Sequence, residues 1–420
     1  MQFAIPRGII YHTVWQDMTA LFKALFVDLD DRRIVRKFES AFAAYMGAPH
    51  GLAFPFARTA LYFTLQLQKY PRGTKIIMPP ITIKAILDVV LELGLIPIFV
   101  DIDPDTLCFN LQQLDDAITD DTKAILITYL YGMVPDLAAM MAICNAHKLF
   151  VIEDFSQCLN GQYQGKKVGT FGDVGIYSAS SIKTLDTYGG GLLVTHHTDL
   201  FHALEQCQET LIQTSRIALL KKIYTDLFRN FVTRRFIFAG VVFPLLRMIQ
   251  FFNPKVLVKN TGERDKMPIK YLPNAWFTRY SAFQAKVGLR SLPNLQMQDA
   301  ERISNAEQIR RKAYGVFPKG VIHAKNVYWQ TIAYFTNPAK ALQFFGKHRI
   351  DSATTSLEKI STLRQYPYQK ILPCADKIYS HALFIPSYPR LRHQDIEHII
   401  TTLNAMTHDP VLTEQVVWTE

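Results

Sequence analysis

The sequence predicts an α/β fold, in which helices sandwich a large, mostly parallel sheet and a smaller α/β domain follows. Between about residues 36 and 200, segments with helical periodicity alternate with short apolar runs. These runs are continuously apolar rather than alternating, which is typical of parallel strands that helices cover on both faces. With 420 residues, 49% of them hydrophobic, the chain can bury a core of that size.

Each predicted helix carries apolar residues at helical spacing and ends at a residue that stops a helix. Gly47, Pro71 and Gly94 provide such stops. Each predicted strand is a short apolar run, and two prolines close the first of them. The predicted helices span residues 38–48, 61–70, 83–94, 111–118 and 136–147, and the predicted strands span 75–80, 96–103, 124–130, 150–155, 174–180 and 191–196.

A basic and apolar segment separates the two predicted domains. We expect a large domain with an N-terminal arm over residues 1–211, a helical insertion over 212–272 and a smaller C-terminal domain over 273–420. Between 216 and 247 the chain holds seven bases and one acid, Asp226. On a helical wheel this segment has an apolar and a basic face. Residues 216–252 therefore suit either an anionic membrane surface or packing on the protein body or a partner subunit.

The composition narrows the classes of partner and compartment. A net charge of +10 suits an anionic partner, such as a phosphorylated substrate or a membrane surface, and is also compatible with a generally basic protein. Five scattered cysteines without a C-x-x-C pair predict neither a metal site nor a disulfide framework. They favour a reducing compartment, and no signal peptide or transmembrane run is evident. We therefore expect a cytoplasmic protein.

Two charged residues after predicted strands are candidates for chemistry. Asp154 lies at the end of the strand at 150–155, where an open α/β sheet binds its ligands, although an N-cap or loop aspartate would give the same pattern. Lys183 follows the strand at 174–180 in a region poor in other charge. A lysine that forms a Schiff base needs a sheltered position of this kind. On spacing alone, a solvated loop lysine is the simpler interpretation.

Groups that suit a phosphate lie near these two residues in the sequence. A helix opens at Arg58, Thr59 and Ala60, and helix N-termini bind anions, although Thr59 is also a good N-cap residue. Three hydroxyl residues and a glycine triplet surround Lys183, and they suit either a phosphate site or a turn. These are Ser178, Ser180, Ser181 and glycines 189–191.

Taken together and in this order, the motifs resemble a known family. The run "VDIDPDT" is followed by "LYG", "VIEDFSQ" and "SASSIKTLDTYGGG". The chain thereby resembles the sugar aminotransferases of the DegT/DnrJ/StrS family, which are fold-type I enzymes that use pyridoxal 5'-phosphate (PLP). The resemblance covers most of the chain, from "FESAFAAYMGA" to "ALFIPSYPRL".

The resemblance implies roles at the centre of a PLP site. Lys183 matches the lysine that forms the Schiff base with PLP and then moves the proton. Asp154 matches the carboxylate that pairs with the pyridine nitrogen and keeps the ring protonated. Gln157 matches the residue near the PLP hydroxyl, and Ser178 matches a phosphate-binding hydroxyl.

The resemblance also implies groups at the rim of the site. Thr59 and Ala60 match the helix N-terminus that cradles the phosphate, and Arg58 would add a charge there. Ile83 stands where the family usually places an aromatic ring over the cofactor. Arg279 matches a position that reaches cofactor or substrate phosphates from the neighbouring subunit. We therefore expect a homodimer with no metal and no nucleic-acid partner.

The implied reaction transfers an amino group from glutamate or glutamine to a keto sugar, usually one linked to a nucleotide, in surface glycan or secondary-metabolite biosynthesis. The chain departs from the family at Tyr129, Leu159 and Phe277. Because of these departures, the family pattern does not define the substrate pocket. Two alternatives therefore stay open. The chain is a PLP enzyme acting on a non-sugar ketone, or a degenerate aminotransferase scaffold that binds at the inner membrane face.

Overall fold

A seven-stranded sheet forms the centre of the computed structural model, which describes residues 3–252, 271–363 and 368–406. Its order is β1-β10-β9-β6-β5-β2-β4. The five strands from β9 to β4 pair in parallel, and β10 is antiparallel to both of its neighbours, so six of the seven strands share one direction. The strands are β1 (His50–Phe54), β2 (Lys75–Met78), β4 (Ile96–Phe99), β5 (Thr122–Thr128), β6 (Phe150–Asp154), β9 (Val174–Ser178) and β10 (Gly191–Thr195). The predicted α/β fold with a mostly parallel sheet is confirmed.

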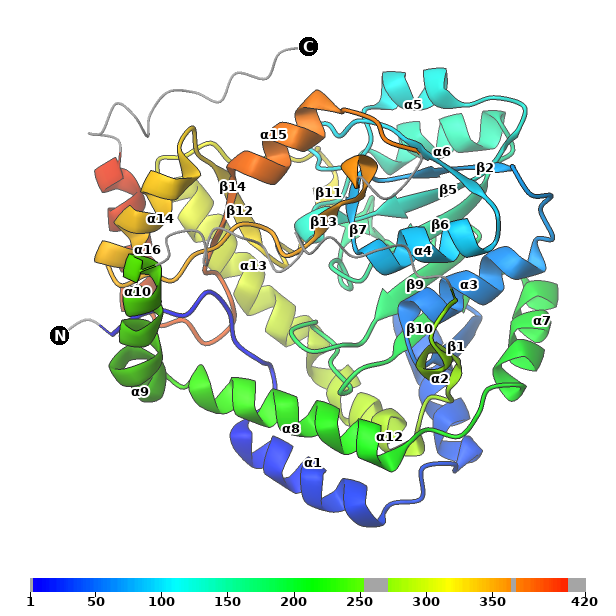
Figure 1. Cartoon of the computed structure of the whole chain (residues 1–420), viewed down its shortest axis with the longest axis horizontal. Coiled ribbons are helices and arrows are strands. Elements are labelled where there is room, and N and C mark those ends of the chain that lie inside the picture. Colours follow the sequence, from blue (N-terminus) through cyan, green and yellow to red (C-terminus); the bar gives the residue numbers. More distant parts are fainter. Residues whose placement is uncertain (1–2, 253–270, 364–367, 407–420) are drawn as a thin grey trace.

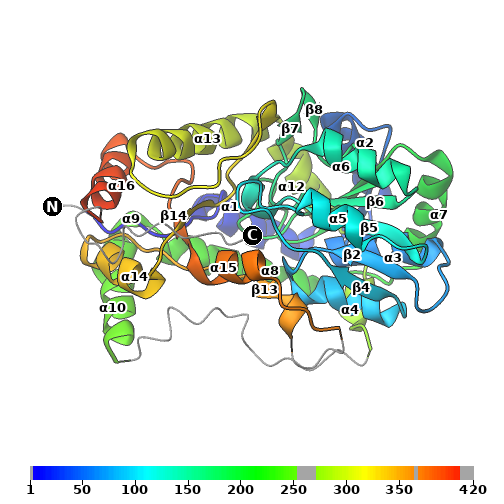
Figure 2. The same ribbon diagram turned by 90° about the horizontal axis from the view of Figure 1, so that it is seen from above.

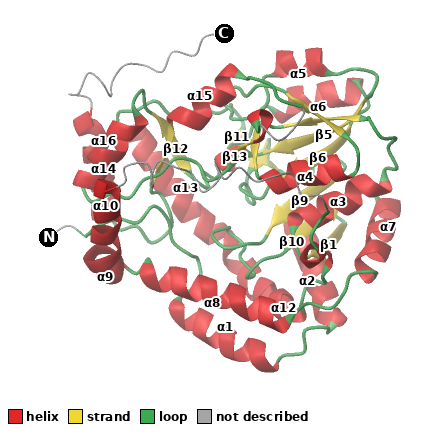
Figure 3. Cartoon of the chain, viewed as in Figure 1, coloured by secondary structure: helices red, strands yellow, loops and turns green. Residues whose placement is uncertain are grey.

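Helices cover both faces of this sheet, as Figure 3 shows by colour. Successive strand residues point to opposite faces, so Ile76 and Ile77 of β2 belong to two different hydrophobic cores. One face packs against α3 (Ala57–Leu67), α4 (Lys84–Glu92) and α7 (Thr198–Glu209). The other packs against α2 (Arg32–Met46), α5 (Leu111–Ala117), α6 (Leu137–Ala146) and α12 (Ala282–Ser291). Burial on both faces explains the continuous apolar runs of the sequence.

Most differences from the predicted elements lie at their ends. The strand expected over 75–80 ends at Met78, and the short β3 (Ile81–Thr82) then pairs with β13 (Glu358–Lys359). Helix α3 begins at Ala57 rather than at residue 61, and its N-cap is Phe56. The suggestion that Thr59 is the N-cap is therefore wrong.

The C-terminal part packs its helices on a small antiparallel sheet with a core of its own. Helix α13 (Leu295–Lys312) runs from α12 toward this unit, as Figure 2 shows from above. The unit contains β12 (Thr331–Tyr334), α14 (Pro338–Lys347), α15 (Pro373–His381), β14 (Ala382–Ile385) and α16 (His393–Ala405). A separate three-stranded sheet joins β7 (Gln162–Tyr163), β8 (Lys166–Lys167) and β11 (Ala324–Lys325). Single 3-10 turns lie at Leu130–Gly132, Asn274–Phe277, Leu292–Asn294 and Ile360–Thr362.

The predicted insertion forms a helical layer against the N-terminal helix. Figure 1 shows α8 beside α1 along one edge of the molecule. The two helices share a small core to which Leu219 and Ile223 of α8 contribute, whereas Tyr224 and Phe228 stay exposed. The layer comprises α8 (Arg216–Val232), α9 (Arg235–Ile237), a π-helical turn (Phe238–Val242) and α10 (Phe243–Phe252), and it packs on α1 (Val14–Phe26). Residues 253–270 of the predicted insertion lie outside the described residues.

Among the helices of the described ranges, none combines the length and the apolar character that crossing a membrane requires.

Candidate active site

The candidate residues converge at the carboxyl ends of β6 and β9. Asp154 is the last residue of β6, and Ser178 is the last residue of β9. The two strands are parallel neighbours, so their ends lie at one edge of the sheet. The connection from β9 to β10, residues 179–190, contains Lys183 and is called the lysine loop below.

Lys183 is partly sheltered rather than fully solvated. Its Nζ atom lies 3.7 Å from the centroid of the Trp329 ring, whose Nε1 donates a hydrogen bond of 2.9 Å to the carbonyl of Ile182. Burial lowers the pKa of Lys183 to about 7; Asp154 opposes the shift and Arg302 adds to it. A lysine with such a pKa is substantially neutral near pH 7, which makes its amine a nucleophile and a proton acceptor. The environment therefore favours a chemical role over that of an ordinary loop lysine.

Asp154 is held by the turn that follows its own strand. Its Oδ1 accepts a hydrogen bond of 3.0 Å from the N–H of Ser156. Burial raises the pKa of Asp154, while bonds from Ser156 and the charge of Lys183 lower it. The hydroxyl of Ser156 in turn accepts a 2.9 Å hydrogen bond from the N–H of Ser178, which ties the ends of the two strands together.

Gln157 and Ser178 lie on the same edge in fixed positions. The Oε1 of Gln157 accepts a 2.7 Å hydrogen bond from the N–H of Tyr131, so the side-chain orientation is set. The hydroxyls of Ser178 and Ser180 lie 3.1 Å apart and share a hydrogen bond. Both serines keep further hydrogen-bonding capacity for a ligand.

The glycine triplet brings the lysine loop to the start of α3. Gly190 has φ of 128° and pairs with Phe56, the residue before α3. A Cβ atom at Gly191 would lie 2.1 Å from the carbonyl carbon of Phe56, so this close approach requires glycine. The N-terminus of α3 thus lies against the end of the loop that carries Lys183.

The first turn of α3 is packed against the segment around Trp276. Thr59 is buried, and its hydroxyl donates a 2.6 Å hydrogen bond to the carbonyl of Trp276. The guanidinium carbon of Arg58 lies 4.0 Å and 4.3 Å from the ring centroids of Phe56 and Trp276. Ala60 is fully buried in the helix behind them. The three predicted residues therefore lie at one helix end, with the Thr59 hydroxyl already bonded to protein.

Ile83 and Arg279 are the remaining two residues of the predicted set. Ile83 precedes α4, and 42% of it is exposed. The Nη2 of Arg279 donates a 3.1 Å hydrogen bond to the carbonyl of Glu209 at the end of α7. No contact of either side chain with Lys183 is found within the described part of the chain, and their roles stay predictions.

The structure adds residues that the sequence did not single out. Trp329 covers the amine of Lys183, and Arg302 lies fully buried with its Nη2 2.5 Å from Asp299. The i,i+3 spacing of Asp299 and Arg302 is visible in the sequence, but their distance from Lys183 along the chain conceals the connection. Lys222 of α8 also approaches the start of α3, because its Nζ lies 4.7 Å from the centroid of the Phe56 ring.

A family model for the DegT/DnrJ/EryC1/StrS aminotransferases matches residues 23–216 and 257–404. The chain belongs to this aminotransferase family. The matched stretches leave out residues 217–256, which contain most of the helical layer formed by α8 to α10.

Several curated proteins are similar to parts of the chain. A pleiotropic regulatory protein of Geobacillus stearothermophilus is 36% identical over 43% of this chain and 48% of its own length. The UDP-N-acetyl-3-dehydro-α-D-glucosamine 3-aminotransferase of Acidithiobacillus ferrooxidans is 35% identical over 41% of this chain and 48% of its own length. The chain thus spans about half the length of the curated relatives it matches.

Solved structures of aminotransferases share the fold over nearly the whole chain. The sugar aminotransferase CalS13 from Micromonospora echinospora superposes with a TM-score of 0.74 and 19% sequence identity. The superposition covers 96% of this chain and 99% of CalS13. The two chains therefore have the same fold.

Proposed function

We propose that the chain is a PLP-dependent transaminase that moves the amino group of glutamate or glutamine to a keto sugar. The observation that carries the proposal is that Lys183 and Asp154 lie at one edge of the sheet, close enough for each charge to affect the pKa of the other group, with the pKa of the lysine lowered to about 7. Membership of the aminotransferase family supports the reaction class.

The residues present fit PLP by their chemistry. Lys183 offers an amine for an aldehyde, and Asp154 offers a carboxylate for a protonated ring nitrogen. Ser178 and the N-terminus of α3 offer donors for a phosphate. Among the described residues, the buried Nε of Arg58 has no hydrogen-bond partner, so it can donate to an anion. We therefore assign these residues as those that would hold PLP.

Bound PLP would supply the electron sink that stabilises the carbanion formed next to the transferred nitrogen. Asp154 would hold the proton on the ring nitrogen, because a carboxylate favours the cationic form of its partner. Lys183 would accept the proton from the substrate carbon and return it at another atom, and its lowered pKa suits both directions near neutral pH. Trp329 would exclude water from the amine that it covers.

The acceptor is proposed to be a nucleotide-linked keto sugar. One relative is named as an aminotransferase of a UDP-linked 3-dehydro sugar, which supports this class of acceptor. The net charge of +10 suits a diphosphate-bearing substrate. Another relative is named as a pleiotropic regulatory protein, which is compatible with the alternative of a scaffold without transaminase activity.

An amino-transfer assay decides between these alternatives. The protein is supplied with PLP and either glutamate or glutamine, and the formation of the 2-oxo acid of the donor is followed with UDP-linked 3-keto sugars and with a cyclitol ketone as acceptors. We expect multiple turnovers with a keto sugar only. Turnover with the cyclitol ketone alone would show that the acceptor is a non-sugar ketone, and conversion of neither donor in any of the mixtures would favour the regulatory scaffold.

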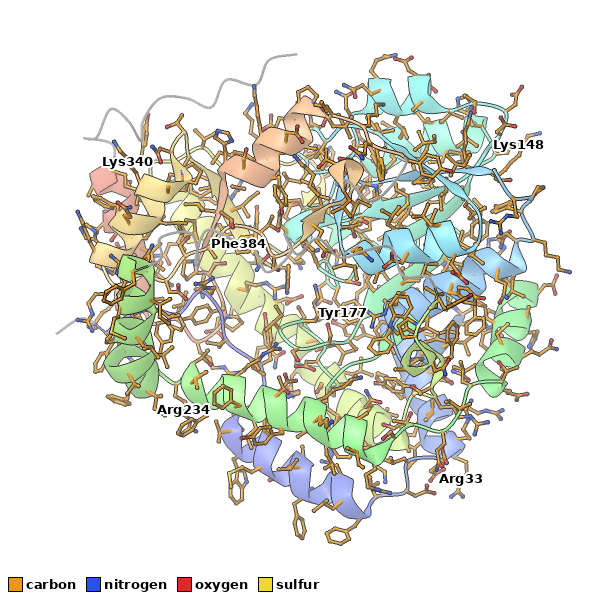
Figure 4. The ribbon with its side chains drawn as sticks, in the orientation of Figure 1. Arg33, Lys148, Tyr177, Arg234, Lys340 and Phe384 are labelled. Carbon is orange, nitrogen blue, oxygen red and sulfur yellow. The ribbon has the colours of Figure 1, made fainter. Side chains whose placement is uncertain are left out.

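We also propose that the chain acts as a homodimer and that its helical layer contacts an anionic membrane surface. The outer faces of α1, α8 and α10 expose large apolar side chains, among them Trp15, Phe22, Phe228 and Phe252. Exposed bases such as Arg234 border them, and Figure 4 places Arg234 at the outer edge of the molecule. Apolar side chains bordered by bases suit the headgroup region of a membrane.

A further inference from the structure

Helix α8 brings a lysine to the edge of the proposed cofactor site. The Nζ atom of Lys222 lies 4.7 Å from the centroid of the Phe56 ring. A Cβ atom at Gly189 would lie 2.8 Å from the same Nζ, so the lysine occupies space that a larger residue would take. Phe56 precedes α3 and pairs with Gly190. Lys222 therefore lies where the N-terminus of α3 meets the glycines that follow Lys183.

A second cation lies against the same ring. The guanidinium carbon of Arg58 is 4.0 Å from the centroid of Phe56, and its buried Nε makes no hydrogen bond to any residue that the structure describes. Burial lowers the pKa of Lys222, the charge of Arg58 lowers it further, and Asp226 opposes both. Burial likewise lowers the pKa of Arg58 to about 10, with Asp88 opposing it. The charge of Arg58 thus disfavours the charged form of Lys222.

The cation pair lacks a matching anion within the described ranges of the chain. Neither Lys222 nor Arg58 forms an ion pair there within 4.0 Å. Asp226, the acid that acts on Lys222, accepts a hydrogen bond from Ser181 and lies 3.8 Å from the guanidinium of Arg229. A phosphate between the two cations would stabilise both, and the first N–H groups of α3 would add donors.

We propose that Lys222 is a ligand of the cofactor phosphate, supplied by helix α8 of the same chain. This inference rests on the proposed PLP-dependent function. It goes beyond that function because α8 lies almost wholly within residues 217–256, which the family model does not match. The helical layer would then serve the cofactor site from within one subunit, beside Arg58 and Ser178.

Cofactor binding to the apoprotein tests the proposal with a phosphate-specific comparison. The apoprotein is titrated with PLP and, separately, with pyridoxal, which lacks the phosphate, and binding is followed by visible absorbance. In Lys222→Met we expect the dissociation constant for PLP to rise at least about tenfold, because a charge-assisted contact is lost. The constant for pyridoxal should stay within about twofold, and Lys222→Arg should restore most of the affinity for PLP. Lys221→Met, at the exposed neighbouring position, should bind both as the wild type does.

Three results would overturn the proposal. If Lys222→Met binds PLP as tightly as the wild type, Lys222 is no ligand. If the affinities for PLP and for pyridoxal fall equally in Lys222→Met, the lysine acts through the structure of the loop. If the wild type binds no PLP, the proposed function fails along with the inference.

A second readout is independent of the chemistry at Lys183. Inorganic phosphate should raise the melting temperature of the wild-type apoprotein and of Lys221→Met, because a ligand of the folded state stabilises it. The rise should be largely lost in Lys222→Met. An undiminished rise would count against the proposal, and the melting curves without phosphate show that each variant is folded.

Discussion

Lys183 differs from a solvated lysine because its amine lies against Trp329 and close enough to Asp154 to feel its charge. Burial lowers the pKa to about 7, so the amine loses its proton near neutrality. We predict that the rate of PLP incorporation into the apoprotein rises with pH and levels off above about 7, because only the neutral amine attacks the aldehyde. Stopped-flow absorbance across pH 5.5 to about 10.5 measures this. A rate that keeps rising to the ordinary lysine value of about 10.4 would contradict it.

A substitution of Asp154 tests whether its charge shifts this pH profile. The carboxylate raises the pKa of Lys183, so Asp154→Asn should move the profile to lower pH. The same change should slow transamination by at least about 100-fold, because the ring nitrogen loses its partner. Asp120→Asn, at an exposed position, is the matched control and should leave both measurements unchanged. A profile that moves to higher pH would show that the two groups are not coupled as described.

At the scale of elements, a buried polar cluster joins the N-terminal segment, the lysine loop and α8. Tyr188 of the loop donates a 2.8 Å hydrogen bond to Asp17 of α1, and Asn230 of α8 donates one of 2.8 Å to the same carboxylate. The Nε2 of His12 lies 3.1 Å from the carbonyl of Asp186. The three elements are therefore expected to order together.

The cluster makes stability depend on pH. Burial by itself lowers the pKa of His12, but the carboxyls of Asp186 and Asp17 outweigh it and raise the pKa from 6.5 to about 9. A raised histidine pKa stabilises the fold fully below about 6.5, and this contribution is lost as pH rises through about 9. Thermal unfolding of His12→Asn should therefore lose part of the wild-type decline between pH 6.5 and 9.

His323→Asn, at an exposed position, serves as the control for that comparison. Its melting temperature should follow the wild-type pH profile throughout. Lys183 is present in all three proteins, so its contribution to the pH dependence of stability cancels when their melting temperatures are compared. Parallel profiles for His12→Asn and the wild type would show that the histidine is not stabilised as described.

Elements that repeat a clear pattern could be predicted from the sequence, and elements completed by distant partners could not. The apolar run at 150–155 predicts a strand, and β6 occupies Phe150–Asp154. Helix α1 was not expected, because Trp15, Phe22 and Phe26 face outward and obscure its periodicity. Tertiary packing on α8, rather than the α1 pattern itself, determines which face is buried.

The residues of the candidate site also differ in whether the sequence could predict them. Asp154 and Lys183 could be found because each follows a strand within a recognisable motif. Trp329 and Lys222 could not, because they reach the site from elements far along the chain and carry no local pattern. Contacts of this kind depend on the tertiary fold, so only the structure shows them.

At the scale of the whole molecule, the helical layer leaves one edge both apolar and basic. We predict that the protein floats with vesicles containing anionic lipid and stays behind with neutral ones. The double variant Lys221→Gln/Arg234→Gln should lose at least half of the floated fraction, because each base near the surface contributes about 1 kcal/mol. Replacing the exposed Lys123 of β5 together with Lys148, which Figure 4 places away from that edge, provides the matched control.

Comparing the flotation of the two variants distinguishes membrane binding through one specific surface from binding through net positive charge. Equal loss in both would mean that only net charge matters. If neither the wild type nor the variants float, and the protein is dimeric by light scattering, a second copy of the chain becomes the better occupant of the apolar faces.

The central claim is that Lys183 carries the cofactor chemistry. Borohydride reduction of the protein loaded with PLP, followed by peptide mass spectrometry, tests it most directly, because reduction makes the bond between lysine and cofactor permanent. The account predicts one pyridoxyl group per chain, located on Lys183, and none on Lys183→Ala treated in the same way. A label on another lysine, or no label on the wild type, would contradict it.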